Sequence, residues 1–391
     1  MTSKFARRAT LATGHPSAEG VLDEPRRGPV GCLERLLVTA QESFVLGVRT
    51  SPRARLWILA YQTLTLPLSL WRYVHDFRAT VEGTEIRVLC VGRRKRFRNL
   101  LDGLFCAVEQ NGPDVRNGAV ERIGGKTPRW AWRPRSLRVH GASLVVVDIH
   151  PWLATNYRRE GWLIVPENVR WQGDLSGLPP LRPPKALRSD MNKVARYGYR
   201  LEEAEGGADW AEFIDEMVLP YARARYGSRA WSPGRRMLRS LQRHGRLFFV
   251  TRGDVRAAGG CFVSTPSDLW FLLLGTRNGD ERWVREGALT ALYLLSFDWA
   301  KRKGYRRFDA GRTRPFPNDG VARYKAKIGL APVPTPLAFT NALYLDPECA
   351  SLAEQLRAEP LFCLEDGSIE VFPPGVGEQE GCGAPRRGVE P

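Results

Sequence analysis

The sequence predicts a mixed α/β protein with two domains. The chain has 391 residues, more than one hydrophobic core usually serves. Hydrophobic residues make up 43% and charged residues 26%, which is typical of globular proteins. Short apolar runs alternate with segments whose apolar residues recur at helical spacing, which indicates strands alternating with helices.

The chain is strongly basic. Lysine and arginine number 59 against 42 acidic residues, which gives a formal net charge of +17. This charge favours anionic partners, namely nucleic acid, a phosphorylated cofactor or an anionic membrane surface. The seven cysteines form no CxxC pair, and the five histidines form no HExxH or HxE pattern. We therefore expect no disulfide framework and no metal ligands, and the cysteine usage favours a reducing cytoplasm.

The N-terminal 80 residues fall into two segments. Residues 1–45 lack the continuous apolar core of a secretory signal, so we expect a disordered tail. Residues 46–80 contain LWILAYQTLTLPLSLW (56–71), which has no charge, is interrupted by Pro67 and has arginines on both sides. We expect an amphipathic or interfacial helical segment here. Three arrangements remain open: packing on the protein's own surface, contact with an anionic membrane surface, and a membrane span.

A small α/β domain is expected over residues 81–175. The buried-strand patterns EIRVLCVG, SLVVVDIH and WLIVP alternate with the helical patterns RFRNLLDGLFCAVEQ and PWLATNYRREG. This alternation favours a largely parallel sheet. Residues 176–185 contain four prolines, so we expect a linker there.

The second domain is expected over residues 186–345. Its longest helix has Leu289, Leu292, Leu295 and Trp299 on one face and is followed by a candidate cap at Gly304. Residues 346–372 form a C-terminal extension, and 373–391 a disordered tail. In order, we expect a basic helix (186–198), a strand (199–204), two helices (208–225 and 233–244) and three antiparallel strands (246–252, 256–265 and 268–275). The long helix (284–304), a strand (306–311), a helix (320–329) and a strand (336–345) follow.

Four stretches of this domain carry a resemblance to a known family. They are RSDMNKVARYGYRLE at 188–202, LPYARARYGSRA at 219–230, GALTALYLLSFDWAKRKGYRRFDAG at 287–311 and DGVARYKAKIG at 319–329. With the order of elements, they resemble the GNAT acyltransferase superfamily, and within it the FemAB-like branch of peptidoglycan interpeptide ligases and CelD-type acetyltransferases. The resemblance implies a GNAT-like acyltransferase domain preceded by a smaller α/β domain.

The resemblance also implies acyl-CoA as co-substrate. GNAT enzymes commonly hold its pyrophosphate with a [QR]-x-x-G-x-[GA] loop before the long helix. In RWVREGA, Arg282 and Gly287 are in register, but Arg285 stands at the first glycine position. Arg282, Arg285, Gly287 and Ala288 are the candidate cofactor-binding residues. The arginines could equally be solvated, and some FemAB-like proteins with a degenerate loop use aminoacyl-tRNA instead.

Acyl transfer to an amine or hydroxyl needs a group that accepts the proton of the nucleophile. Asp309 ends the strand pattern RRFDAG and is the candidate catalytic residue. Alternatively, it accepts backbone hydrogen bonds that shape the following loop.

Six further residues are candidates for binding an anionic acceptor. Lys325 matches the lysine of the family's F/Y-K-x-K-x-G ending, which in the peptidoglycan ligases lies near a phosphorylated acceptor. Helical spacing places Arg323 and Lys327 on one face and Lys325 on another, so the cations need not serve one ligand, and a solvated face is the alternative. The candidate set is Tyr221, Arg225, Arg312, Arg314, Arg323 and Lys325.

The leading hypothesis is a cytoplasmic acyltransferase, either free or peripheral at the inner face of the membrane. It would move an acyl group from acyl-CoA to an amine or hydroxyl of a sugar, sugar nucleotide or cell-envelope precursor by direct attack in a ternary complex. One alternative is aminoacyl transfer from tRNA. Another is a non-catalytic scaffold at the membrane face in polysaccharide biosynthesis.

Overall fold

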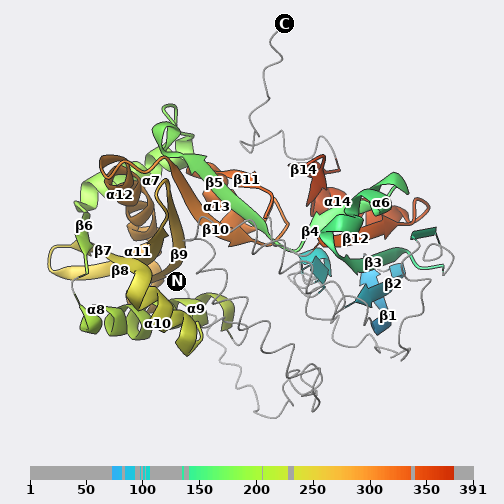
Figure 1. The fold of residues 1–391 in the computed structure, drawn as a ribbon, viewed down its shortest axis with the longest axis horizontal. Coiled ribbons are helices and arrows are strands. Elements are labelled where there is room, and N and C mark those ends of the chain that lie inside the picture. The colour runs from blue at the N-terminus through green and yellow to red at the C-terminus, as the bar shows by residue number, and fades with distance from the viewer. Residues whose placement is uncertain are drawn as a thin grey trace, which may run out of the picture. The chain divides into compact units, whose positions relative to one another are not determined.

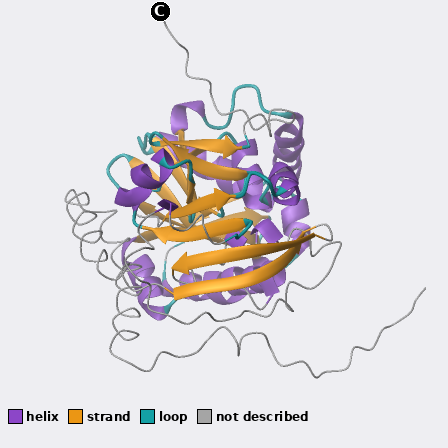
Figure 2. Ribbon diagram, turned by 90° about the vertical axis from the view of Figure 1, so that its right-hand side faces the viewer, coloured by secondary structure: helices purple, strands orange, loops and turns teal. Residues whose placement is uncertain are grey.

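A computed structural model describes residues 73–81, 84–92, 141–204, 206–227, 233–335 and 340–373, with a few positions between 97 and 105 and residues 134–135. These residues belong to the larger of two units into which the chain divides, Val48–Pro391. They form two large sheets, one small hairpin and the helices that pack on them (Figure 1, Figure 2). The tail 1–45, the segment 56–71 and residues 374–391 lie outside the described residues.

The first sheet has the order β1-β2-β3-β12-β4. Only β2 and β3 pair in parallel, so the expectation of a largely parallel sheet was wrong. Apolar clusters cover both faces of the sheet, so residues 144–149 are buried on both sides. Their continuous apolar sequence is therefore like that of a strand in a parallel sheet. The strands are β1 (Tyr73–Val81), β2 (Thr84–Gly92), β3 (Leu144–Ile149), β12 (Thr340–Leu345) and β4 (Leu163–Pro166).

Three segments differ from their expected places. Residues 73–80, expected in a helical segment, form most of β1, where β-branched and aromatic side chains favour a strand. Strand β12, expected in the second domain, lies between β3 and β4 and is antiparallel to both. Strand β5 (Val169–Asp174), expected in the first domain, belongs to the second sheet. The chain therefore passes between the sheets at residues 167–168, before the proline-rich segment.

The proline-rich segment 176–185 is not the connection between the sheets. The 3-10 turn η6 (Leu175–Gly177) leads into it from β5, and Leu178 is buried in the core of the second sheet. The proline-rich composition predicted a break in regular structure, and that break leads into helix α7 (Lys185–Tyr197).

Helices and a hairpin complete the first sheet. The segment expected as one helix after β3 forms a 3-10 turn, η5 (Pro151–Leu153), followed by α6 (Ala154–Arg159). The C-terminal extension forms α14 (Ala350–Ala358) and a hairpin of β13 (Leu361–Glu365) and β14 (Ser368–Phe372).

The second sheet has the order β11-β5-β10-β9-β8-β7-β6. Its strands β7, β8 and β9 form the predicted antiparallel meander, and β10 lies parallel to β9 and antiparallel to β5. Besides β5, the strands of this sheet are β6 (Arg200–Glu203), β7 (Gly245–Arg252), β8 (Val255–Ser264), β9 (Asp268–Thr276), β10 (Arg307–Thr313) and β11 (Ala331–Val333).

The helices of this domain follow the predicted order, with one break. Gly287 adopts a φ of +91°, which glycine tolerates, and it divides the predicted long helix in two. A π-helical turn, η7, joins α8 to α9. The helices are α8 (Gly207–Glu212), η7 (Phe213–Val218), α9 (Leu219–Tyr226), α10 (Arg235–His244), α11 (Glu281–Arg285), α12 (Ala288–Arg302) and α13 (Gly320–Lys327).

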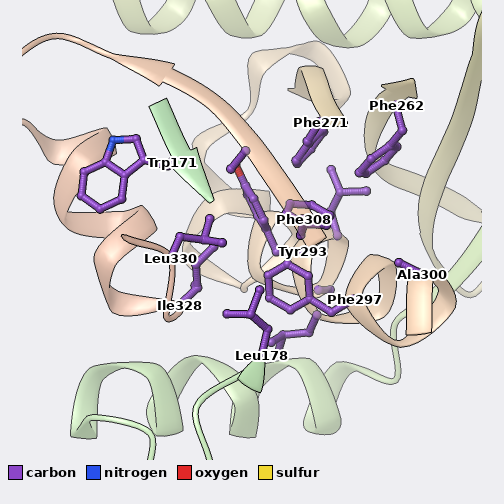
Figure 3. Close-up of a cluster of buried hydrophobic side chains, with 14 of the residues drawn as sticks. Trp171, Leu178, Phe262, Phe271, Tyr293, Phe297, Ala300, Phe308, Ile328 and Leu330 are labelled. Carbon is purple, nitrogen blue, oxygen red and sulfur yellow. The ribbon is translucent and has the colours of Figure 1, made fainter. Parts of the chain in front are cut away.

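Helix α12 packs on the second sheet through aromatic side chains (Figure 3). Phe297 of α12 meets Phe308 of β10 edge to face, with ring centroids 4.7 Å apart, and Tyr293 lies 4.8 Å from Phe271 of β9. Side chains alternate along a strand, so Asp309 projects to the face opposite Phe308. This core therefore fixes the strand that carries the candidate catalytic residue.

Candidate active site

Strands β9 and β10 separate at Asp309. They pair over three residues only, and Asp309 opposite Trp270 is the last pair. Beyond it, β10 continues along β5 with a register shift between Asp309 and Arg312. A second shift, between β8 and β9, leaves Leu272 as an extra residue beside the separation. Bulges of this kind often occur next to active sites, where they change the direction of a strand side chain.

The carboxylate of Asp309 is buried and engaged on both oxygens. Its side chain is 1% exposed, and Oδ2 lies 2.6 Å from Nε of Arg170. Gln172 donates a hydrogen bond to Oδ2 at 3.2 Å, and the backbone N–H of Gly311 donates to Oδ1 at 2.7 Å. The Gly311 contact shapes the loop, as the alternative for Asp309 expected.

Arg170 is a site residue that the sequence analysis missed. Its guanidinium lies 4.4 Å from the ring centroid of Trp270, so its side chain contacts residues of β9 and β10 from β5. Burial lowers the pKa of Arg170, and the charge of Asp309 opposes that shift. The sequence signal that could have identified it is the polar–apolar alternation in β5, where Arg170 and Gln172 alternate with the buried Val169 and Trp171.

Lys325 and Arg312 add a buried and a half-buried cation. Lys325 is 3% exposed, and its Nζ donates to the backbone carbonyl of Arg312 at 3.1 Å. Burial lowers the pKa of Lys325 to about 8, opposed by Asp309 and Asp319. Burial also lowers the pKa of Arg312. Within the described part of the chain, neither cation has a carboxylate at salt-bridge distance, although the charges of Glu167 and Asp309 act on Arg312 and those of Asp309 and Asp319 act on Lys325.

The other expected cations of this segment lie apart from Asp309. Arg314 forms an ion pair of 2.7 Å with Asp319, whose other oxygen caps α13 through the N–H of Val321. Arg323 is exposed. The structure thus brings Arg312 and Lys325 to the site, but not Arg314 and Arg323.

Tyr221 and Arg225 share one face of α9, as their spacing predicted. A hydrogen bond and the charge of Arg225 act on Tyr221, although burial is the larger effect and raises the pKa of Tyr221. Tyr221 also contributes to the raised pKa values of Tyr293 and Tyr324, which places it near α12 and α13.

A family model described as an acetyltransferase (GNAT) domain matches residues 184–326. The chain carries a GNAT-like domain. Its boundaries enclose Asp309 and Lys325, whereas Arg170 lies before them.

Solved structures with similarity to the chain have low identity and low TM-scores. The C-terminal domain of a putative lysylphosphatidylglycerol synthetase from Agrobacterium fabrum is 15% identical, with a TM-score of 0.35 and coverage of 81% of this chain and 94% of that one. FemX is 10% identical, with a TM-score of 0.36 and coverage of 71% of this chain and 89% of that one. A GCN5-related N-acetyltransferase from Sphaerobacter thermophilus is 16% identical, with a TM-score of 0.31 and coverage of 66% of this chain and 71% of that one. A comparison with curated protein sequences finds no significant match.

The expected donor loop of the GNAT-like domain is folded into α11. Three of its backbone N–H groups are used within the chain: Arg282 donates to Oδ1 of Asp280 at 2.7 Å, Glu286 to the carbonyl of Arg282 at 2.8 Å, and Gly287 to that of Val284 at 3.1 Å. A diphosphate would need such groups free.

The side chains at this loop are also occupied. Arg282 lies 3.7 Å from Asp280, and Arg285 lies 3.5 Å from Glu281. Ala288 is fully buried. In this conformation, Arg282 and Arg285 therefore lie beside carboxylates, and the N–H groups of Glu286 and Gly287 are not free for a pyrophosphate.

Two absences apply to the described residues. They contain no group of three histidine, cysteine, aspartate or glutamate side chains placed to hold a metal ion. None of the helices described here is long and apolar enough to cross a membrane.

Proposed function

We propose that this protein is an acyltransferase that modifies an amine or hydroxyl on an anionic acceptor, such as a sugar nucleotide or another cell-envelope precursor. The match of residues 184–326 to a GNAT domain supports the reaction class. The three cations around Asp309, namely Arg170, Arg312 and the buried Lys325, support an anionic acceptor. Transfer would be direct, in a ternary complex of enzyme, donor and acceptor.

The observation that carries the proposal is the burial of Lys325 beside the separation of β9 and β10. Among the residues that the structure describes, this ammonium has one backbone acceptor and no carboxylate at salt-bridge distance, which is costly in the absence of a ligand. An anionic acceptor or the negative charge that develops on the acyl carbonyl oxygen would stabilise it.

Two residues are candidates for accepting the proton. Attack of the acceptor nitrogen or oxygen on the acyl carbon forms the new bond, breaks the bond to the donor and releases one proton. Asp309 is the first candidate, but its oxygens already face Arg170, Gln172 and Gly311. Lys325, with its pKa lowered to about 8, is partly neutral near physiological pH and is the second candidate.

A label-transfer experiment tests the proposal. The full chain is incubated with [¹⁴C]acetyl-CoA or with ¹⁴C-aminoacyl-tRNA and a panel of sugar nucleotides and lipid-linked envelope precursors. We expect label in an anionic product that chromatography separates from the labelled donor, and at least about a 100-fold loss of rate in Lys325→Ala, as for removal of one charge-stabilising donor. Transfer only to neutral acceptors, or no transfer from either donor, would contradict the proposal.

Aminoacyl transfer from tRNA is the second candidate function. The observation that favours it is the donor loop, where the N–H groups of Arg282, Glu286 and Gly287 are bonded within the chain and so are not free for a pyrophosphate. The formal net charge of +17 also suits a nucleic acid. In the same assay, label would come from aminoacyl-tRNA alone, and the rate would fall steeply with salt.

A non-catalytic scaffold at the inner membrane face is the remaining alternative. Its sequence support, residues 56–71, lies outside the described residues, and the cytoplasmic location likewise stays a proposal. Cells that carry Asp309→Asn together with Lys325→Ala would distinguish it, because a scaffold would keep its function in that variant whereas an enzyme would lose it.

A further inference from the structure

Asp190 of α7 lies between two lysines. Its Oδ1 lies 3.3 Å from Nζ of Lys193, one turn further along α7, and its Oδ2 lies 2.6 Å from Nζ of Lys327 on α13. Lys327 also lies 4.7 Å from the ring centroid of Tyr324. One carboxylate therefore joins α7 to α13 and neutralises part of the charge of both lysines.

This ion-pair group lies against the N-terminal end of α12. A Cβ atom built on Gly287 would be 3.4 Å from Cβ of Lys193 and 3.7 Å from the backbone oxygen of Asp190. Tyr324, whose pKa is influenced by Asp190, donates a hydrogen bond at 3.1 Å to Thr290 in the first turn of α12. Helix α7 thus covers the helix end that follows the expected donor loop.

We infer that Asp190 acts as an internal anion that closes this end of α12 to a phosphate-bearing donor, so that the acyl donor is held without a diphosphate there. The inference rests on the proposed acyltransferase function and deepens it, because it concerns the class of donor. It does not depend on which acceptor is used.

Charge and hydrogen bonding lead to this inference together. A diphosphate placed beside Gly287 would find the ammonium groups of Lys193 and Lys327 already paired with the Asp190 carboxylate and would have to compete with it for them. It would also find the loop N–H groups of Glu286 and Gly287 already bonded. Binding through these lysines would therefore require the Asp190 ion pairs to break.

Isothermal titration of the full chain tests the inference with three probes: acetyl-CoA, S-acetylpantetheine, and 3′-phosphoadenosine 5′-diphosphate, the nucleotide part of coenzyme A. For the unaltered protein we expect no saturable binding of the nucleotide below about 1 mM, and acetyl-CoA no more than about threefold tighter than S-acetylpantetheine. Nucleotide binding below about 100 μM, weakened by Arg285→Ala, would overturn the inference. That result would leave the acyltransferase proposal standing, whereas absence of label transfer would defeat that proposal alone.

The substitution Asp190→Ala provides the second arm. It leaves Lys193 and Lys327 without their carboxylate, so we expect at least about a tenfold gain in nucleotide affinity. Asp298→Ala, at an exposed position of α12, changes the net charge equally and is the matched control. Equal gains in both variants, or no gain in Asp190→Ala, would overturn the role of Asp190. If Asp190→Ala fails to fold, Asp190→Asn makes the same comparison with nearly the native side-chain shape.

Discussion

Arg170 on β5 places Nε 2.6 Å from Oδ2 of Asp309 on β10, while its guanidinium lies 4.4 Å from the ring centroid of Trp270 on β9. One side chain therefore contacts both strands at the point where they separate. Since Asp309 is fully buried, the pair is protected from the solvent screening that weakens surface ion pairs.

Substitution Arg170→Ala should destabilise the protein by about 3 kcal/mol, because it leaves the buried Asp309 carboxylate without its ion-pair partner. Arg170→Lys should lose less, since it keeps the charge but not the planar group stacked on Trp270. Urea unfolding monitored by circular dichroism gives both values.

The control for this prediction is Arg78→Ala, which removes an exposed ion pair with Glu85. That pair should contribute between about 0 and 1 kcal/mol. If Arg170→Ala cost no more than this control, Asp309 would not depend on its partner.

Lys325 should make the free energy of unfolding depend on pH. Burial lowers its pKa from 10.5 to about 8, so between these values the unfolded chain binds a proton that the folded protein has lost. The free energy of unfolding should therefore rise with pH in this window, relative to a Lys325→Met variant, by on the order of 3 kcal/mol. Urea unfolding of both proteins from pH 7.5 to 10.5 measures the difference. A difference that stays constant with pH would show that the lysine pKa is not lowered.

Substitution Gly275→Ala should destabilise the GNAT-like domain by about 1–3 kcal/mol through overpacking. A Cβ atom there would lie 2.4 Å from the carbonyl carbon and oxygen of Met217, and these are backbone atoms of η7 that cannot rotate away. Gly320→Ala is the control, because its Cβ would meet no atom within 4 Å and alanine favours the helix that begins there. Thermal unfolding should show a lower midpoint for Gly275→Ala alone.

Arg256 should be required for the attachment of α8 to the sheet. Its guanidinium pairs with Glu202 of β6, and with Asp209 at 2.7 Å and Glu212 at 2.6 Å in α8. Arg256→Ala removes this partner from Glu202 and Asp209, while Glu212 keeps its pair with Arg277, and we expect a loss of about 2 kcal/mol, less than for a fully buried pair. Hydrogen exchange should become faster over residues 207–218.

For comparison, Arg246→Ala removes a half-exposed pair with Glu203 on the same sheet. Exchange over residues 207–218 should stay unchanged in this control. Similar acceleration in both variants would indicate general destabilisation instead of a specific attachment by Arg256.

Local sequence signals predicted the centre of the second sheet well. The three strands between residues 245 and 276 are consecutive and joined by short turns, so their pairing follows from the turns. The break in the long helix was foreseeable from Gly287, since a glycine inside a helical pattern marks a position of low helix propensity.

Sheet membership of β5 and β12 could not be predicted in the same way. Each strand has an ordinary apolar pattern, and nothing in six residues identifies a partner strand far away in sequence. The same limitation hid Arg170, because its importance depends on the pairing of β5 with β10. Lys325 was found through its motif, but its burial and lowered pKa depend on the surrounding packing.

The position of β12 has a consequence for the order in which the protein is completed during synthesis. Among the described residues, β4 has β12 as its strand partner, and β12 is made only after every strand of the second sheet. At about 5–20 residues per second, the ribosome needs on the order of ten seconds or more to pass from β4 to β12. The GNAT-like domain can therefore assemble on the nascent chain first, and the sheet whose strands emerge earliest is finished last.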